Sequence, residues 1–244
     1  MTARNALPMQ DLADVAACCR ILGALLFRPP DHAECAPILE LAGAGGLARR
    51  WPLGDPAIVR QAARRMQTGL SEPDAQNLAA EYQRLFVGPD PLAAPPWASV
   101  YLEEEGTLFG ASTQALRTLL DGAGLALATG QHEPEDHIGL LCWAAAMLAG
   151  DGRRAALRAL LAHHLLNWSA DYFGRLSRAT RQPFYSGLAA LAAETLADIG
   201  RRLGVEAASP PHLMAAPMPG SATHSAAEAA DAAAAAGLPR SVVS

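Results

Sequence analysis

The chain has 244 residues, of which 51% are hydrophobic, and it carries a formal net charge of −5. All of its basic residues are arginines; the absence of lysine excludes a Walker A phosphate loop, a pyridoxal Schiff base and a lysine general base. The negative charge argues against nucleic-acid binding, for which a basic face is expected, and suits a basic or neutral partner.

Three helices are predicted in the first third of the chain, because apolar residues recur there at helical spacing over 12–26, 38–41 and 56–70. A fourth helix carries Tyr82, Leu85 and Phe86 on one stripe and stops at Gly88. The four prolines of residues 88–97 then predict a stiff connector without helix.

The second half of the chain is also predicted to be helical. We expect Ser112 to cap one helix, and Pro134 to lie in the first turn of another that carries His137 on its apolar face. Further helices are predicted over 157–164, 168–176 and 183–203. Valine and isoleucine together number only twelve, and no segment alternates apolar and polar residues, so we predict an all-α, single-domain helical bundle.

The predicted domain covers residues 1–204. Residues 205–244 are rich in alanine, proline, serine and glycine, and this composition predicts a disordered tail. No window approaches the roughly 20 apolar residues of a membrane span, and acidic residues stand where a signal peptide would be apolar. The four cysteines show no CxxC spacing, so we expect a reduced protein in the cytoplasm.

The stretch from Trp97 to His137 holds the densest run of acidic residues, with seven acids against one base, Arg117. Such a surface suits a peptide that carries arginines, because carboxylates accept paired hydrogen bonds from guanidinium groups. A solvated acidic face is the simpler interpretation. Glu135 and Asp136, expected in the first turn of their helix, could equally serve to stabilise the positive end of the helix dipole.

An enzymatic interpretation would pair Asp136 with His137, and would use Ser99 or Ser112 as a nucleophile. Adjacent helical residues point about 100° apart, and no GxSxG elbow is present. A metal site could combine His132 and His137 with a glutamate, but the spacing matches no HExxH or CxxC pattern. We therefore predict no catalytic residue, metal or cofactor, and keep a small helical hydrolase or metal-dependent enzyme as the alternative.

Four segments of this region together resemble the TorD/DmsD family of redox-enzyme maturation chaperones, and most closely its DmsD branch. They are EYQRLFVGP (81–89), PPWASVYLEEEGTLFG (95–110), STQALR (112–117) and EPEDHIG (133–139). The resemblance covers residues 75–203 well, the N-terminal helices more loosely and the tail not at all. Asn167 departs from the family, which usually has proline there, and Tyr101 stands where tryptophan also occurs.

The resemblance implies an all-α cytoplasmic chaperone. Such proteins bind the twin-arginine leader of a molybdenum-cofactor reductase subunit and delay its export until the cofactor is inserted. The leader-binding residues it implies are Tyr82, Leu85, Phe86, Trp97, Ser99, Tyr101, Gly110, Glu133, Asp136 and His137.

The partners expected are the leader and the folding catalytic subunit of a reductase similar to dimethyl sulfoxide reductase. A nitrate reductase or trimethylamine N-oxide reductase subunit is the alternative client. A helical interaction module without leader preference is a further alternative for the function. We expect a monomer, and a dimer that exchanges helices across residues 88–97 remains open. Nothing in the sequence supports guanine nucleotide binding.

Overall fold

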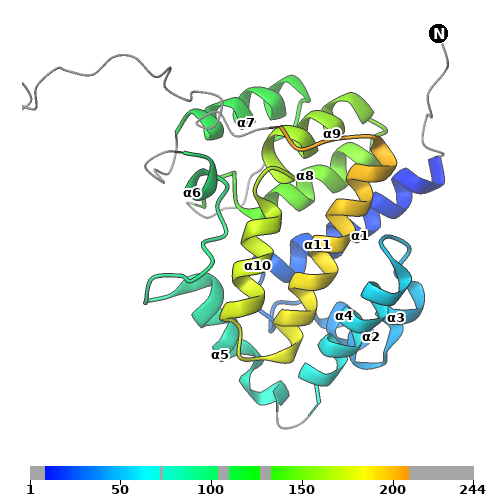
Figure 1. Ribbon diagram of the computed structural model, residues 1–244, viewed down its shortest axis with the longest axis vertical. Helices are drawn as coiled ribbons and strands as arrows, with labels where there is room; N and C mark the ends of the chain where they lie inside the picture. Colours follow the sequence, from blue (N-terminus) through cyan, green and yellow to red (C-terminus); the bar gives the residue numbers. More distant parts are fainter. Residues whose placement is uncertain (1–8, 72–73, 104–109, 127–132, 209–244) are drawn as a thin grey trace, which may run out of the picture. The chain divides into compact units, whose positions relative to one another are not determined.

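Helices account for the regular structure of this protein. The computed structural model describes residues 9–71, 74–103, 110–126 and 133–208, and no strand occurs within these ranges. The predicted all-α class is therefore confirmed. The α-helices are α1 (Met9–Phe27), α2 (Ala36–Gly43), α3 (Gly46–Arg50), α4 (Pro56–Gly69), α5 (Leu78–Tyr82), α6 (Ser99–Leu102), α7 (Ala111–Gly122), α8 (Ile138–Gly150), α9 (Arg154–Leu160), α10 (Ser169–Ala179) and α11 (Pro183–Leu203); a 3₁₀ turn, η1 (Asp74–Asn77), and two π-helical turns, η2 (Gln83–Val87) and η3 (Leu161–Leu165), adjoin them (Figure 1).

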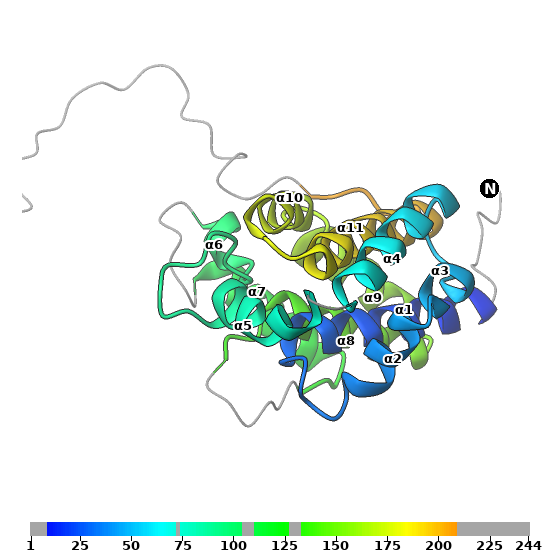
Figure 2. The same cartoon turned by 90° about the horizontal axis from the view of Figure 1, so that it is seen from below.

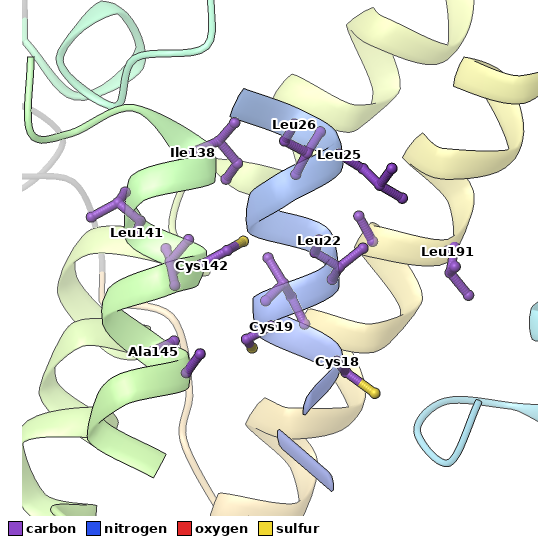
Figure 3. Close-up of a cluster of buried hydrophobic side chains, with 14 of the residues drawn as sticks. Cys18, Cys19, Leu22, Leu25, Leu26, Ile138, Leu141, Cys142, Ala145 and Leu191 are labelled. Atoms are coloured by element: carbon purple, nitrogen blue, oxygen red, sulfur yellow. The ribbon is translucent and has the colours of Figure 1, made fainter. Parts of the chain in front are cut away.

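Helix α1 lies at the centre of the core, between α8 and α11 (Figure 3). Its buried residues Cys19, Leu22 and Leu26 lie between Leu141 and Cys142 of α8 on one side and Leu191 of α11 on the other. Because these side chains recur at helical spacing, α1 presents apolar groups to both neighbours.

Two glycines let the principal helix pairs approach closely. A Cβ at Gly139 of α8 would lie 2.7 Å from the Phe27 Cβ of α1, and a Cβ at Gly187 of α11 would lie 2.5 Å from the Ala62 carbonyl oxygen of α4. Only a residue without a side chain fits at these distances. Figure 2 shows the resulting pairs, α1 beside α8 and α4 beside α11.

The long helices agree with the sequence predictions, because their ends carry local signals. Pro56 and Pro183 occupy the first turns of α4 and α11, and Gly204 ends α11 with a φ of 59°. The structure adds α3 and α6, two short helices that the sequence did not predict. Segments of four or five residues are too short to display a helical period.

The predicted cap of α7 was wrong. Gly110 is the N-cap residue and Ser112 lies inside the helix, because the Glu103 carboxylate accepts the Ser112 backbone N–H at 2.7 Å. A carboxylate nine residues earlier in the chain thus replaces the serine hydroxyl as the capping group.

All four cysteines are buried and free, which agrees with the absence of a disulfide framework. None of the helices that the structure describes is long and apolar enough to cross a membrane. Helix α11 ends at Leu203, and the domain boundary predicted at residue 204 stays a prediction. Most of the predicted tail, residues 209–244, lies outside the described ranges, so its disorder stays a prediction.

Candidate functional site

A short antiparallel backbone bridge between Trp97 and His137 joins two of the predicted motif segments. The Ile138 N–H donates to the Pro96 carbonyl oxygen at 2.8 Å, and the Ala98 N–H donates to the Asp136 carbonyl oxygen at 3.1 Å. Segments that are about forty residues apart in sequence thereby form one continuous patch of the protein.

This bridge corrects the predicted start of α8. The helix begins at Ile138, so Pro134, Glu135 and Asp136 precede it and do not lie in its first turn. His137 has an extended backbone, with φ −63° and ψ 133°, because it pairs with Trp97. The predicted helix-dipole role of Glu135 and Asp136 was therefore wrong as well.

Asp136 is a buried carboxylate, only 2% exposed, that anchors α6. Its Oδ2 accepts the Ser99 backbone N–H at 2.8 Å, one of the first-turn donors of that helix. Burial raises the pKa of Asp136, while the Ser99 hydroxyl and amide act to lower it. Within the described part of the chain, neither the other carboxylate oxygen, Oδ1, nor the Ser99 Oγ has a hydrogen-bond partner of good geometry.

His137 caps α8 with its side chain. Its Nδ1 accepts the Gly139 backbone N–H at 3.0 Å, which makes Nε2 the protonated nitrogen of the neutral ring. The ring meets Phe27 and Trp97 edge to face, at centroid distances of 5.0 and 6.4 Å. Burial lowers the pKa of His137 to about 3, so the imidazole is neutral at physiological pH. Asp136 and His137 thus each serve a separate structural bond, which argues against an acid–base pair.

The protein is expected to lose stability in weak acid because of His137. The folded state keeps this ring neutral down to a pKa of about 3, whereas the unfolded chain protonates it near 6.5. Below about pH 6.5 the unfolded state therefore binds the extra proton, and stability falls as the pH falls. Between pH 7 and pH 5 this effect amounts to about 2 kcal/mol.

The matched variant for this prediction is His137→Asn, since asparagine offers an N-cap oxygen but does not titrate. Urea denaturation at pH 7 and pH 5 should show a smaller loss for the variant. His164, whose pKa burial lowers to about 4, and Asp136 titrate in both proteins, so their effects cancel in the comparison. Equal losses of stability in wild type and His137→Asn would contradict the prediction that His137 causes the loss in weak acid.

The predicted apolar residues of the site, Tyr82, Leu85 and Phe86, are all buried. The Tyr82 hydroxyl donates to the Phe27 carbonyl oxygen at 2.7 Å, and its ring stacks on Phe86 at 4.9 Å. Leu85 and Phe86 lie in the π-helical turn η2, which widens the helix just before Gly88. These three side chains support the site from inside and do not form an open groove in this conformation.

Three predicted residues form the accessible part of the site. Trp97, Tyr101 and Glu133 are half-buried. The Trp97 indole N–H donates to Glu133 Oε1 at 2.6 Å, and Tyr101 packs at 5.1 Å from Trp168, with the Arg175 guanidinium 4.9 Å from its ring centroid. The surface thus combines aromatic faces with a carboxylate.

Gly110 makes room for the Glu103 carboxylate, because a Cβ there would lie 2.6 Å from its carboxyl carbon. Beside this cap, Arg117 of α7 makes two hydrogen bonds of 3.0 Å to Glu135. Arg117 lowers the pKa of Glu135 despite partial burial. The only base of the acidic stretch therefore ties α7 to the segment that precedes α8.

Sequence reasoning missed Phe27, which contacts both Tyr82 and His137. It also missed Trp168 and Arg175, which surround Tyr101. No local pattern marks these residues, because they reach the site from α1 and α10. Within the described ranges no three histidine, cysteine or acidic side chains are placed to share a metal ion, and His132 lies outside those ranges.

Comparison with known proteins places this chain among chaperones. The model of the family described as nitrate reductase delta subunit matches residues 54–173. The Tat proofreading chaperone DmsD of Salmonella typhi is 39% identical over 198 residues, which cover 81% of this chain and 95% of the relative. The probable Tat proofreading chaperone DmsD of Haemophilus influenzae is 37% identical and covers 72% and 85% of the two chains. A solved structure, a redox enzyme maturation protein of Archaeoglobus fulgidus described as putative, aligns with a TM-score of 0.49 at 20% identity and covers 81% and 98% of the two chains.

Proposed function

We propose that this chain, which belongs to the TorD/DmsD family of redox-enzyme maturation chaperones and to its DmsD branch, binds the twin-arginine leader of a redox enzyme. The family consists of chaperones and not of catalytic enzymes. The client is the catalytic subunit of a molybdenum-cofactor oxidoreductase similar to dimethyl sulfoxide reductase. The protein acts in the cytoplasm as a monomer. By binding the leader, it delays export of the catalytic subunit until the cofactor is inserted and the subunit has folded.

The observation that carries this proposal is the Trp97–His137 bridge. It brings two family motifs into one patch, in which buried Asp136 and His137 fix the backbone beneath half-buried Trp97 and Glu133. A surface held by hydrogen bonds from below loses little conformational entropy when a peptide binds.

The chemistry of the patch fits a peptide that carries arginines. Glu133 has one oxygen engaged by the Trp97 indole, and a carboxylate can accept several further hydrogen bonds. A guanidinium can therefore pair with Glu133 while it stacks on the Trp97 ring. Glu135 already holds Arg117 in such a paired geometry on the same patch.

Titration of a purified leader peptide tests the function. We expect replacement of its two arginines with glutamine to weaken binding at least tenfold, and Glu133→Gln to produce a loss of similar size with the native leader. The arginine-free leader should distinguish little between wild type and Glu133→Gln, because the charge pair is already absent.

Two results would count against the proposal. Equal binding of the native and arginine-free leaders would indicate an interaction module without leader preference. Absence of binding to any leader by folded wild-type protein would remove the chaperone role.

A further inference from the structure

A hollow lies beside the candidate site, between α7 on one wall and α9 with η3 on the other. Its volume is about 600 Å³. Ala111, Ala115 and Leu119 line the α7 wall, and Ala159 and His164 line the opposite one. Leu102 and Glu103, which directly follow the site residue Tyr101 at the end of α6, also line the hollow. We call this hollow the α7 groove.

Among the residues that the structure describes, two polar atoms of the α7 groove are buried without a hydrogen-bond partner: Ser112 Oγ and Asn167 Oδ1. The amide nitrogen of Asn167 donates to the His163 carbonyl oxygen at 2.9 Å, so its oxygen is left as an acceptor. The Ser112 hydroxyl offers a donor. An unpaired buried polar atom costs about 1–3 kcal/mol, which a bound ligand would recover.

A peptide backbone supplies the complement of these two atoms. Its N–H can donate to Asn167 Oδ1, and its C=O can accept from the Ser112 hydroxyl. The remaining lining is largely alanine and leucine, which leaves room for apolar side chains of the peptide. The groove therefore fits an extended apolar segment rather than a charged one.

The charges around the α7 groove favour basic residues beside the apolar segment of the bound peptide. No arginine is among the described residues that line it, and its rim carries Glu103. Helix α7 also bears exposed Asp121, and Glu135 is held against α7 by Arg117. An apolar segment that is preceded or followed by arginines complements this arrangement, and an acidic partner does not.

We propose that the α7 groove receives the apolar segment of the leader, while the arginines bind at Trp97 and Glu133. This inference rests on the proposed function and deepens it. This contact lies away from Tyr82, Leu85 and Phe86, which the family resemblance implies as leader-binding residues but whose side chains are buried in the core.

The test fills the α7 groove with a phenylalanine ring and measures the affinity of the protein for two peptides. Ala115→Phe places a ring in the groove from an exposed position on α7, and Gln114→Phe adds the same ring at the exposed neighbour that does not line the groove. Each variant is titrated with the full leader and with a short peptide that keeps the arginines but lacks the apolar segment. Ala159→Phe, on the opposite wall, is an independent second filling variant.

We expect Ala115→Phe and Ala159→Phe to weaken the full leader at least tenfold and to leave the short peptide unchanged. Gln114→Phe should bind both peptides as wild type does. Full-leader binding that is unchanged in both filling variants would overturn the inference and leave the proposed function standing. If wild type binds neither peptide, the proposed function and this inference fail together.

A photoreactive residue in the apolar segment of the leader locates the contact directly. Crosslinks to α7 or α9 support the inference. Crosslinks confined to α5 and η2 would overturn it, because they would mean that the buried Tyr82–Phe86 segment opens to receive the leader.

Discussion

Trp97→Ala is expected to weaken leader binding about 30-fold. Tryptophans at the centre of an interface commonly contribute about 2 kcal/mol or more. Trp97 is half-buried, and its indole N–H donates to Glu133 and so orients that carboxylate. Isothermal titration with a native leader measures the change. The affinity of Trp97→Phe should fall between those of wild type and Trp97→Ala, because phenylalanine keeps an aromatic face but loses the hydrogen bond to Glu133.

A matched control separates this effect from a general loss of apolar surface. Ile58 on α4 is 43% exposed and lies on another part of the helical domain, so Ile58→Ala should bind the leader as wild type does. Because the Trp97 ring also meets His137, the thermal midpoint of each variant is measured alongside the affinity. A folded Trp97→Ala protein with wild-type affinity would remove Trp97 from the binding surface.

Gly139→Ala is expected to destabilise the protein by about 2 kcal/mol, within the range for overpacked cores. The added methyl group would lie 2.7 Å from the Phe27 Cβ and 3.1 Å from the Gly23 carbonyl oxygen, and a helix backbone cannot easily yield. Helices α1 and α8 must then separate, and the His137 cap moves with α8. Urea denaturation measures the change in the free energy of unfolding.

The same substitution at the other end of α8 provides the control. Outside its own helix, a Cβ at Gly150 would meet no atom of the described residues within 4 Å. Gly150→Ala should therefore be neutral or stabilising by up to about 1 kcal/mol through helix propensity. A loss of stability in Gly139→Ala without a loss in Gly150→Ala would show that contact with α1 causes the destabilisation. A neutral Gly139→Ala would contradict the close approach of the two helices.

The sequence predicted the long helices well, because proline and glycine mark the ends of α4 and α11 and apolar periodicity marks their faces. It failed where a distant residue decides the local conformation. Pro134 followed by acidic residues is typical of a helix start, yet the bridge from Trp97 holds His137 extended and delays α8 to Ile138. Likewise, Glu103 displaced Ser112 as the cap of α7.

The motif resemblance brought together residues that periodicity alone would have assigned separately to the core or to a loop. It could not distinguish which of them face solvent. Tyr82 is buried against the C-terminal end of α1, and Phe86 is buried beside Tyr82 and Tyr185. These contacts leave no trace in the spacing of either segment. The α7 groove was also invisible, since alanines on a helix predict packing and not an opening.

The contacts of Phe27 have a consequence for when the chaperone becomes active during its own synthesis. Its carbonyl oxygen accepts a hydrogen bond from Tyr82, 55 residues further along the chain, and its ring contacts His137, directly before α8. The Trp143 indole of α8 donates to the Arg20 carbonyl oxygen of α1, 123 residues earlier in the chain. Closing loops of this length is slow compared with forming a local helix. A nascent chain therefore cannot assemble the patch around Trp97 and His137, where we propose that the leader binds, until α8 has left the ribosome. We expect an incomplete copy of the chaperone to leave the leader of a client unbound.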